Sequence, residues 1–264
     1  MKINVSAGHG KDGAVGCGAV GLIYESTEAR KVKNLVIKYL KAEGHTVYDC
    51  TVDVGKDASD ILKKIVKKCN AHDVDLDVSI HFNSGVSDKK GNDKTTGTEV
   101  LIYNAKSKAY DEAKRVCDKI AKLGFKNRGI KLRSDLYFLN STNAPAMLIE
   151  VCFVNDKDDV ELYKKNIDNI AKAIVEGIQN KAIKKVVVSK KETVEKTTFK
   201  EYKVKINTEV LKIRKGAGTK YGTNGSVKKG EVYTIVDEKW NGKTKWLKLK
   251  SGRGWISAKY TKKV

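Results

Sequence analysis

The first 180 residues alternate between short apolar runs and longer amphipathic stretches, and this alternation restricts the possible folds more than any other feature. Strands that alternate with helices form a sheet covered by helices on both faces, with mostly parallel neighbours. Residues 1–180 are therefore expected to form an α/β domain with a mixed, mainly parallel sheet sandwiched by helices. The expected strands are residues 3–7, 45–50, 77–81, 98–103, 136–139 and 146–150, and the expected helices are residues 27–43, 57–71, 107–123 and 157–179.

The pattern changes after residue 180. Residues 181–200 are rich in Lys, Ser and Thr and lose the alternation, which predicts a basic linker. From Tyr202 onward, short alternating segments are separated by turn residues, a pattern typical of a small all-β barrel. We therefore expect a second domain over residues 201–264.

The formal net charge of +21 is distributed unevenly. Residues 1–180 contain 29 Lys and Arg against 25 Asp and Glu, whereas residues 181–264 contain 24 against 7. The C-terminal part therefore predicts an anionic partner: nucleic acid, a membrane surface or an acidic wall polymer. A uniformly lysine-rich composition is the alternative, and the sharp division between the two parts argues against it.

Several classes of protein are disfavoured. The five cysteines are odd in number and widely spaced, which indicates reduced, buried side chains and no cysteine zinc site. No run of about 18 apolar residues is present, so no transmembrane segment is expected. The chain enters a strand without a charged-then-apolar leader, so we expect synthesis in the cytoplasm without a signal peptide.

Three polar groups follow apolar strand patterns in the first domain. His9 lies between Gly8 and Gly10 after the first strand, and His81 and Glu150 follow two later apolar runs. The carboxyl ends of strands form the edge at which ligands bind in open α/β sheets. Two imidazoles and one carboxylate are a common ligand set for a catalytic zinc ion.

The carboxylate that completes the ligand set is not decided by spacing. Glu25 and Glu28 both lie near the start of the first helix, where acidic residues are favourable in any case. Glu150 differs because it adjoins an apolar run, where burying a carboxylate costs free energy unless the carboxylate is paired or has a catalytic role. Glu150 is therefore expected to act as a general base, and a buried salt bridge with an arginine such as Arg133 is the alternative.

Together these motifs resemble the zinc-dependent N-acetylmuramoyl-L-alanine amidases of the Amidase_3 type over residues 1–179. The resemblance implies that zinc is held by His9, Glu25 and His81, and that Glu150 is the catalytic glutamate. It implies hydrolysis of the amide between N-acetylmuramic acid and L-alanine in bacterial peptidoglycan, with Asn83 or Arg133 as expected substrate-binding donors. The segments that carry it are residues 8–10, the region of Glu25, and residues 79–83, 127–129, 136–139 and 148–150.

The C-terminal part resembles bacterial SH3-like wall-binding modules over residues 202–262. Ala217 stands where that family usually has proline. Trp246 and Trp255, together with Trp240 and the tyrosines, are expected to form a face that stacks on the wall ligand, although tryptophans of so small a barrel are as often core residues. The matching segments are residues 211–218, 229–230, Trp246 and residues 254–256.

Four functional interpretations follow. A phage endolysin, which reaches the wall after release from the cytoplasm through a holin pore or by lysis, fits best. A host autolysin with the same activity is the second, and a zinc carboxypeptidase-like enzyme is the third. A non-enzymatic adhesion or nucleic-acid-binding protein would leave His9, His81 and Glu150 unexplained, and no nucleic-acid-binding motif is present, so the expected partners are peptidoglycan and anionic wall polymers.

Overall fold

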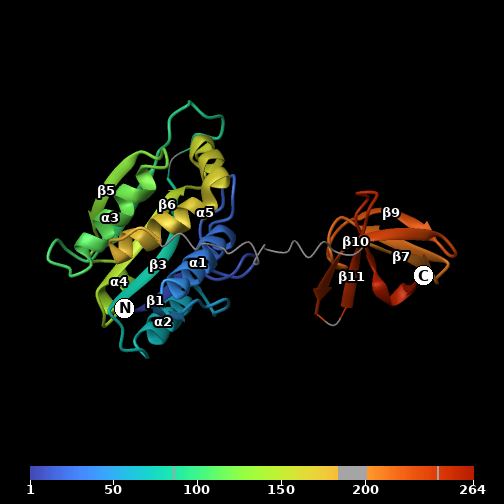
Figure 1. Ribbon diagram of the computed structural model, residues 1–264, viewed down its shortest axis with the longest axis horizontal. Helices are drawn as coiled ribbons and strands as arrows, with labels where there is room; N and C mark the ends of the chain where they lie inside the picture. The colour runs from blue at the N-terminus through green and yellow to red at the C-terminus, as the bar shows by residue number, and fades with distance from the viewer. Residues whose placement is uncertain (86, 184–200, 243) are drawn as a thin grey trace. The chain divides into compact units, whose positions relative to one another are not determined.

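The computed structural model describes residues 1–85, 87–183, 201–242 and 244–264, and the chain divides into two compact units, Met1–Lys185 and Val186–Val264 (Figure 1). Most of the predicted linker, residues 181–200, lies outside the described residues.

The first unit is built on a six-stranded sheet with the order β2-β1-β3-β6-β4-β5. All neighbouring strands are parallel except β4 and β6, which are antiparallel. The predicted mixed, mainly parallel sheet is thereby confirmed. Its strands are β1 (Lys2–Ala7), β2 (Thr46–Asp49), β3 (Leu76–Asn83), β4 (Thr98–Ile102), β5 (Asn127–Leu132) and β6 (Ala146–Phe153).

Helices cover both faces of this sheet, as the alternation of elements requires. One face packs against α1 (Glu25–Ala42), α3 (Tyr110–Ala121) and α5 (Lys157–Gln179), and these three helices share the larger apolar core (Figure 1). The other face carries α2 (Ala58–Cys69) and the short α4 (Tyr137–Ser141), with a smaller core. A cavity lies beside this face, lined by residues of β3, β6, α2 and α4.

Local signals in the sequence explain where two of the helices begin. Asp57 precedes α2, and its carboxylate accepts a 2.8 Å hydrogen bond from the backbone N–H of Asp60. Asp156 caps α5 in the same way through the N–H of Asp159, at 2.9 Å. Such caps satisfy backbone donors that have no partner within the helix.

Residues 136–139, predicted as a strand, are corrected by the structure. Tyr137–Ser141 form the short helix α4, in which Leu139 and Asn140 donate to the carbonyl of Leu136. Phe138 and Leu139 are both buried in the smaller apolar core beside α2. The edge strand β5 (Asn127–Leu132) was not predicted, because its sequence is too polar to show an apolar alternation.

The second unit contains a seven-stranded sheet with the order β13-β7-β10-β11-β12-β8-β9, and all its pairings are antiparallel. Its buried apolar residues form a core of their own. A single 3-10 turn, Ala258–Tyr260, precedes the last strand. The strands are β7 (Tyr202–Ile206), β8 (Val210–Arg214), β9 (Thr223–Lys228), β10 (Val232–Asn241), β11 (Thr244–Leu249), β12 (Trp255–Ser257) and β13 (Thr261–Lys263).

No described helix combines the length and the apolar character that crossing a membrane requires.

The close contact between α3 and α5 generates a stability prediction for Gly177→Ala. Alanine is the better helix former by about 1 kcal/mol, but a Cβ at this position would lie 2.6 Å from Val116 Cγ2 and 2.7 Å from Val116 Cα. Overpacking of this kind costs about 1–3 kcal/mol. We therefore expect a lower free energy of unfolding, measured by denaturant titration. Lys165→Ala, at an exposed position on the same helix, is the control, and a Gly177→Ala variant as stable as this control would contradict the packing described.

Candidate functional site

The register between β3 and β6 places two of the predicted residues side by side. His81 is the direct partner of Glu150 across these parallel strands, and Ser79 is the partner of Leu148 on the same face. Both strands continue beyond the two residues, so His81 and Glu150 lie near the carboxyl ends of their strands and not at the last position. Because side chains alternate between the two faces of a strand, Ser79 and His81 on β3 project from the same face as Leu148 and Glu150 on β6. This is the face that α2 and α4 cover.

His9 reaches this point because the chain turns sharply after β1. His9 adopts a left-handed backbone conformation, with φ of 65°. The adjacent Gly8 lies against the ring of His81, since a Cβ on Gly8 would be 2.0 Å from His81 Cε1. Any side chain at position 8 would displace the imidazole, which explains the glycine before His9 in physical terms.

Glu25, the first residue of α1, lies between the two histidines. Its Oε1 is 3.1 Å from His81 Nδ1 and 3.3 Å from His9 Nε2. The same carboxylate accepts backbone hydrogen bonds from Phe82 at 3.1 Å and from Ala19 at 2.8 Å. Glu25 is only 3% exposed, so the site holds a buried carboxylate surrounded by donors.

The surroundings keep this carboxylate ionised. Burial raises the pKa of Glu25. The hydrogen bonds from His81 and His9, together with the charges of these histidines, lower the pKa by more than burial raises it, so the net pKa of Glu25 lies well below its usual range. Burial also lowers the pKa of His81, against the attraction of Glu25. An ionised glutamate and a neutral imidazole are the protonation states that bind a divalent cation. Ser79 Oγ, 3.0 Å from His81 Nε2, fixes the orientation of the ring.

The three side chains have the arrangement that a metal site requires. One donor atom from each of His9, Glu25 and His81 lies within 4.8 Å of the others. No lysine or arginine forms an ion pair with Glu25 in the part of the chain that the structure describes, where the two histidines are the basic side chains that contact it. Two imidazoles and a buried carboxylate that pairs with no lysine or arginine fit a zinc ion that keeps an open coordination position.

Glu28, the alternative ligand, points elsewhere. Its carboxylate accepts hydrogen bonds from Lys31 at 2.7 Å and from Tyr163 Oη at 2.7 Å. Glu28 is not part of the His9–Glu25–His81 group, although it is one helical turn from Glu25. The structure therefore brings Glu25, and not Glu28, to the two histidines.

Glu150 lines a cavity of about 490 Å³ together with His9 and His81. Its Oε2 is buried and has no hydrogen-bond partner among the described residues. Burial, followed by the negative charges of Glu25 and Glu99, raises the pKa of Glu150 well above its usual value. A carboxyl group with a raised pKa and a free oxygen beside a metal-type site is suited to general acid–base chemistry.

The alternative interpretation of Glu150, a buried salt bridge with Arg133, is not observed. Arg133 lines the same cavity, but its guanidinium pairs with Asp135 at 2.7 Å. The Arg133 side chain therefore stays at the wall of the cavity, where it can contact a bound molecule.

Asn83 is placed differently from the expectation. Its amide donates to Glu99 Oε1 at 2.7 Å, and its side-chain oxygen accepts from the N–H of Ser84. Asn83 is not among the residues that line the cavity. Glu99 also pairs with Arg128 at 2.6 Å and is the strand partner of Glu150 on β4. Glu99 is not among the residues expected from the sequence. The feature that points to it is a carboxylate within the apolar run of residues 98–102.

The tryptophans of the second unit differ in exposure. Trp246 is 4% exposed, so its ring packs inside the unit and is removed from the expected stacking face. Trp255 is half-buried, with Lys248 over its ring at 5.9 Å. Trp240 is 64% exposed and has Lys245 5.7 Å from its ring centroid. The accessible ring is therefore that of Trp240.

Comparison with known proteins connects this geometry to a family. Over 98% of its length, the chain is 35% identical to an uncharacterised protein of Clostridium perfringens, of which it covers 78%. An endolysin of Bacillus phage SPP1 is 32% identical over 66% of this chain and 63% of the phage protein.

A solved structure shares the fold of the first unit. The catalytic domain of the CD27L endolysin, which targets Clostridium difficile, superimposes with a TM-score of 0.62 at 33% identity. The match covers 70% of this chain and 99% of that domain.

The family model of N-acetylmuramoyl-L-alanine amidases, Amidase_3, matches residues 3–180, which contain the six-stranded sheet except Lys2, the three clustered side chains and Glu150. This chain belongs to the N-acetylmuramoyl-L-alanine amidase family Amidase_3.

Proposed function

We propose that this chain is a zinc-dependent amidase that cleaves the bond between N-acetylmuramic acid and L-alanine in bacterial peptidoglycan. Membership of the amidase family identifies the type of hydrolase. The observation that supports the zinc-dependent mechanism is the position of Glu150, which lines the same cavity as His9 and His81 and has a free buried oxygen.

His9, Glu25 and His81 are proposed to hold the metal. A zinc ion bound there would supply Lewis acidity that polarises the scissile carbonyl. The two backbone N–H groups on Glu25, together with Ser79 beside His81, hold these ligands in fixed orientations.

Glu150 is proposed to accept the proton of the attacking water and to pass it to the leaving nitrogen of L-alanine. Burial and the charges of Glu25 and Glu99 raise the pKa of Glu150, so its carboxylate is a stronger base than that of an exposed glutamate.

The remaining walls of the cavity are proposed to position the substrate. They are largely apolar, with Leu62, Leu136 and Tyr137 among the lining residues, and Arg133 supplies a charged group. Apolar walls exclude water from the reacting amide, and a guanidinium can bind a carbonyl or carboxylate oxygen of the stem peptide.

The second unit is proposed to be an SH3-like module that binds the wall. Its small antiparallel sheet, the exposed ring of Trp240 and the positive charge of residues 181–264 support this assignment. Anionic wall polymers would be attracted by the charge, and sugar or peptide groups would stack on the aromatic ring.

The assignment of the metal ligands predicts different results for two neighbouring glutamates. Glu25→Gln should lose tight zinc binding and wall lysis, because the buried carboxylate between the histidines is removed. Glu28→Gln should keep about one zinc per chain, because that carboxylate contacts only Lys31 and Tyr163 in the contacts described. Zinc content after dialysis and the rate of wall lysis measure both effects. Zinc loss confined to Glu28→Gln would move the ligand to that residue.

The role of Glu150 predicts a separation of metal binding from turnover. Glu150→Gln keeps the size of the side chain but cannot accept a proton, so the variant should retain zinc while turnover falls by about 10²–10⁴-fold. Metal content and the release of stem peptides with a new N-terminal alanine are measured on the same preparation. Loss of zinc would instead make Glu150 a ligand, and normal turnover would leave it a structural carboxylate.

The proposed wall-binding role predicts the behaviour of a chain that ends at residue 183. Because the first unit has its own sheet and core, this variant should still cleave soluble muropeptides. It should sediment less with purified walls than the full-length chain, and the difference should shrink as salt rises toward about 1 M, at which charges are screened beyond about 3 Å. Equal wall binding by both chains would remove the assigned role.

A further inference from the structure

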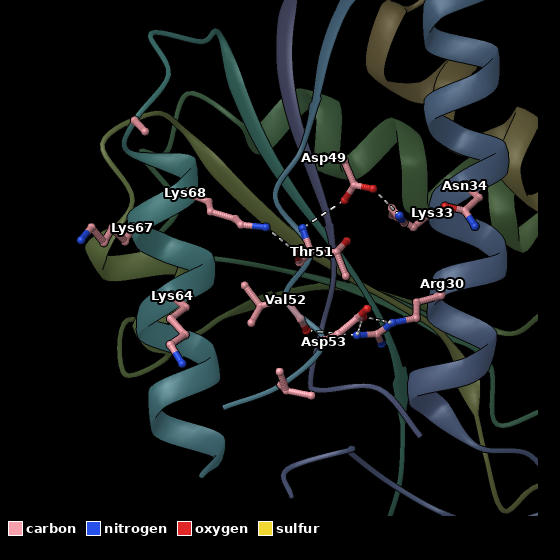
Figure 2. Close-up of a pocket in the computed structure, with 12 residues that line it drawn as sticks. Arg30, Lys33, Asn34, Asp49, Thr51, Val52, Asp53, Lys64, Lys67 and Lys68 are labelled. Atoms are coloured by element: carbon pink, nitrogen blue, oxygen red, sulfur yellow. Dashed lines mark hydrogen bonds and ion pairs between the residues drawn. The ribbon is translucent and has the colours of Figure 1, made fainter. Parts of the chain in front are cut away.

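A second hollow, of about 770 Å³, lies between α1 and α2 beside the edge strand β2 (Figure 2). Figure 2 shows basic side chains on both of its sides, from Arg30 and Lys33 on α1 and from Lys64, Lys67 and Lys68 on α2. Asp49, the last residue of β2, and residues 51–54 after it form the floor between the helices. The hollow shares no lining residue with the cavity that contains Glu150.

The α1 side of the hollow is a neutral, fixed framework. Lys33 is buried and pairs with Asp49 at 2.6 Å, and Arg30 pairs with Asp53 at 3.0 Å. Arg30 also donates to the carbonyl of His9, at 3.2 Å, and to the carbonyl of Val52, at 3.1 Å. These contacts tie the floor of the hollow to the loop that carries His9.

The α2 side supplies the uncompensated charge. Ile61, Ile65 and Cys69 form the buried stripe of this helix, and the lysines occupy the exposed face at helical spacing. Lys64 pairs with Asp60 at 2.7 Å, whereas Lys67 forms no ion pair within the described residues and Lys68 donates only to the carbonyl of Thr51.

The lysine row also connects the two hollows. Lys63, the neighbour of Lys64 on the exposed face of α2, lines the cavity of Glu150. The exposed lysines of α2 therefore extend from the rim of the catalytic cavity, at Lys63, to the second hollow, at Lys64.

We propose that this lysine face of α2, with the hollow beside it, binds the phosphate groups of an anionic wall polymer attached to the peptidoglycan being cleaved. Ammonium groups on flexible stems act as point charges and suit a repeating phosphodiester, whereas a single fixed carboxylate favours the planar fork of arginine. The separate lining of the two hollows favours a neighbouring polymer strand over the stem peptide itself. This inference rests on the proposed amidase function and assigns the first unit a wall contact of its own.

The test compares two full-length variants that carry the same C-terminal unit. Lys67→Gln/Lys68→Gln removes the two lysines without an ion pair, and Lys164→Gln/Lys165→Gln removes two exposed lysines of α5 that line neither hollow. Kinetics are measured on native Gram-positive walls, on the same walls freed of phosphate polymers with hydrofluoric acid, and on a soluble muramyl peptide.

For Lys67→Gln/Lys68→Gln we expect KM on native walls to rise about fivefold or more, with kcat unchanged. A fivefold change in affinity is about what one basic residue contributes to binding at an anionic surface. On stripped walls and on the muramyl peptide this variant should equal the control. No rise on native walls overturns the proposal, and an equal rise on stripped walls assigns the contact to peptidoglycan carboxylates instead. Failure of the unsubstituted chain to cleave the muramyl peptide would reject the amidase function itself, which separates the two questions.

Discussion

The buried carboxylate of Glu25 is the interaction on which the rest of the site depends. A lone ionised carboxylate with 3% exposure would be strongly unfavourable, and here two backbone N–H groups and two imidazoles compensate it. These contacts bring together the loop after β1, the first turn of α1 and the end of β3. The site therefore forms only where these three segments pack together, and a divalent cation would complete its charge balance.

Two glutamates near each other have opposite protonation behaviour because their surroundings differ. Hydrogen bonds and the charges of His81 and His9 outweigh burial at Glu25 and lower its pKa, whereas burial and the neighbouring carboxylates raise the pKa of Glu150. One side chain thereby stays ionised, and the other can take and release a proton. Such divergence between neighbouring titratable groups distinguishes ligand from acid–base roles in many hydrolases.

Charge is used differently in the two units. In the first unit several basic side chains near the functional residues form ion pairs, as Arg133 does with Asp135 and Arg30 with Asp53. In residues 181–264 the basic residues far outnumber the acidic ones. Close pairs position groups over a few ångströms, while an excess of charge attracts a polymer over a Debye length. The first arrangement suits catalysis, and the second suits retention on a wall.

The sequence by itself determined the alternation of strands and helices, the mixed sheet, and His9, His81 and Glu150 as chemically unusual residues, because periodicity and residue type are local properties. It did not determine that residues 137–141 form a helix, since so short an apolar run fits either state. Only the tertiary structure brought Glu25 to the histidines in place of Glu28, engaged Asn83 with Glu99, and buried Trp246 while exposing Trp240. Each of these outcomes depends on which side of an element meets a distant segment, and that is decided by packing between residues far apart in the chain.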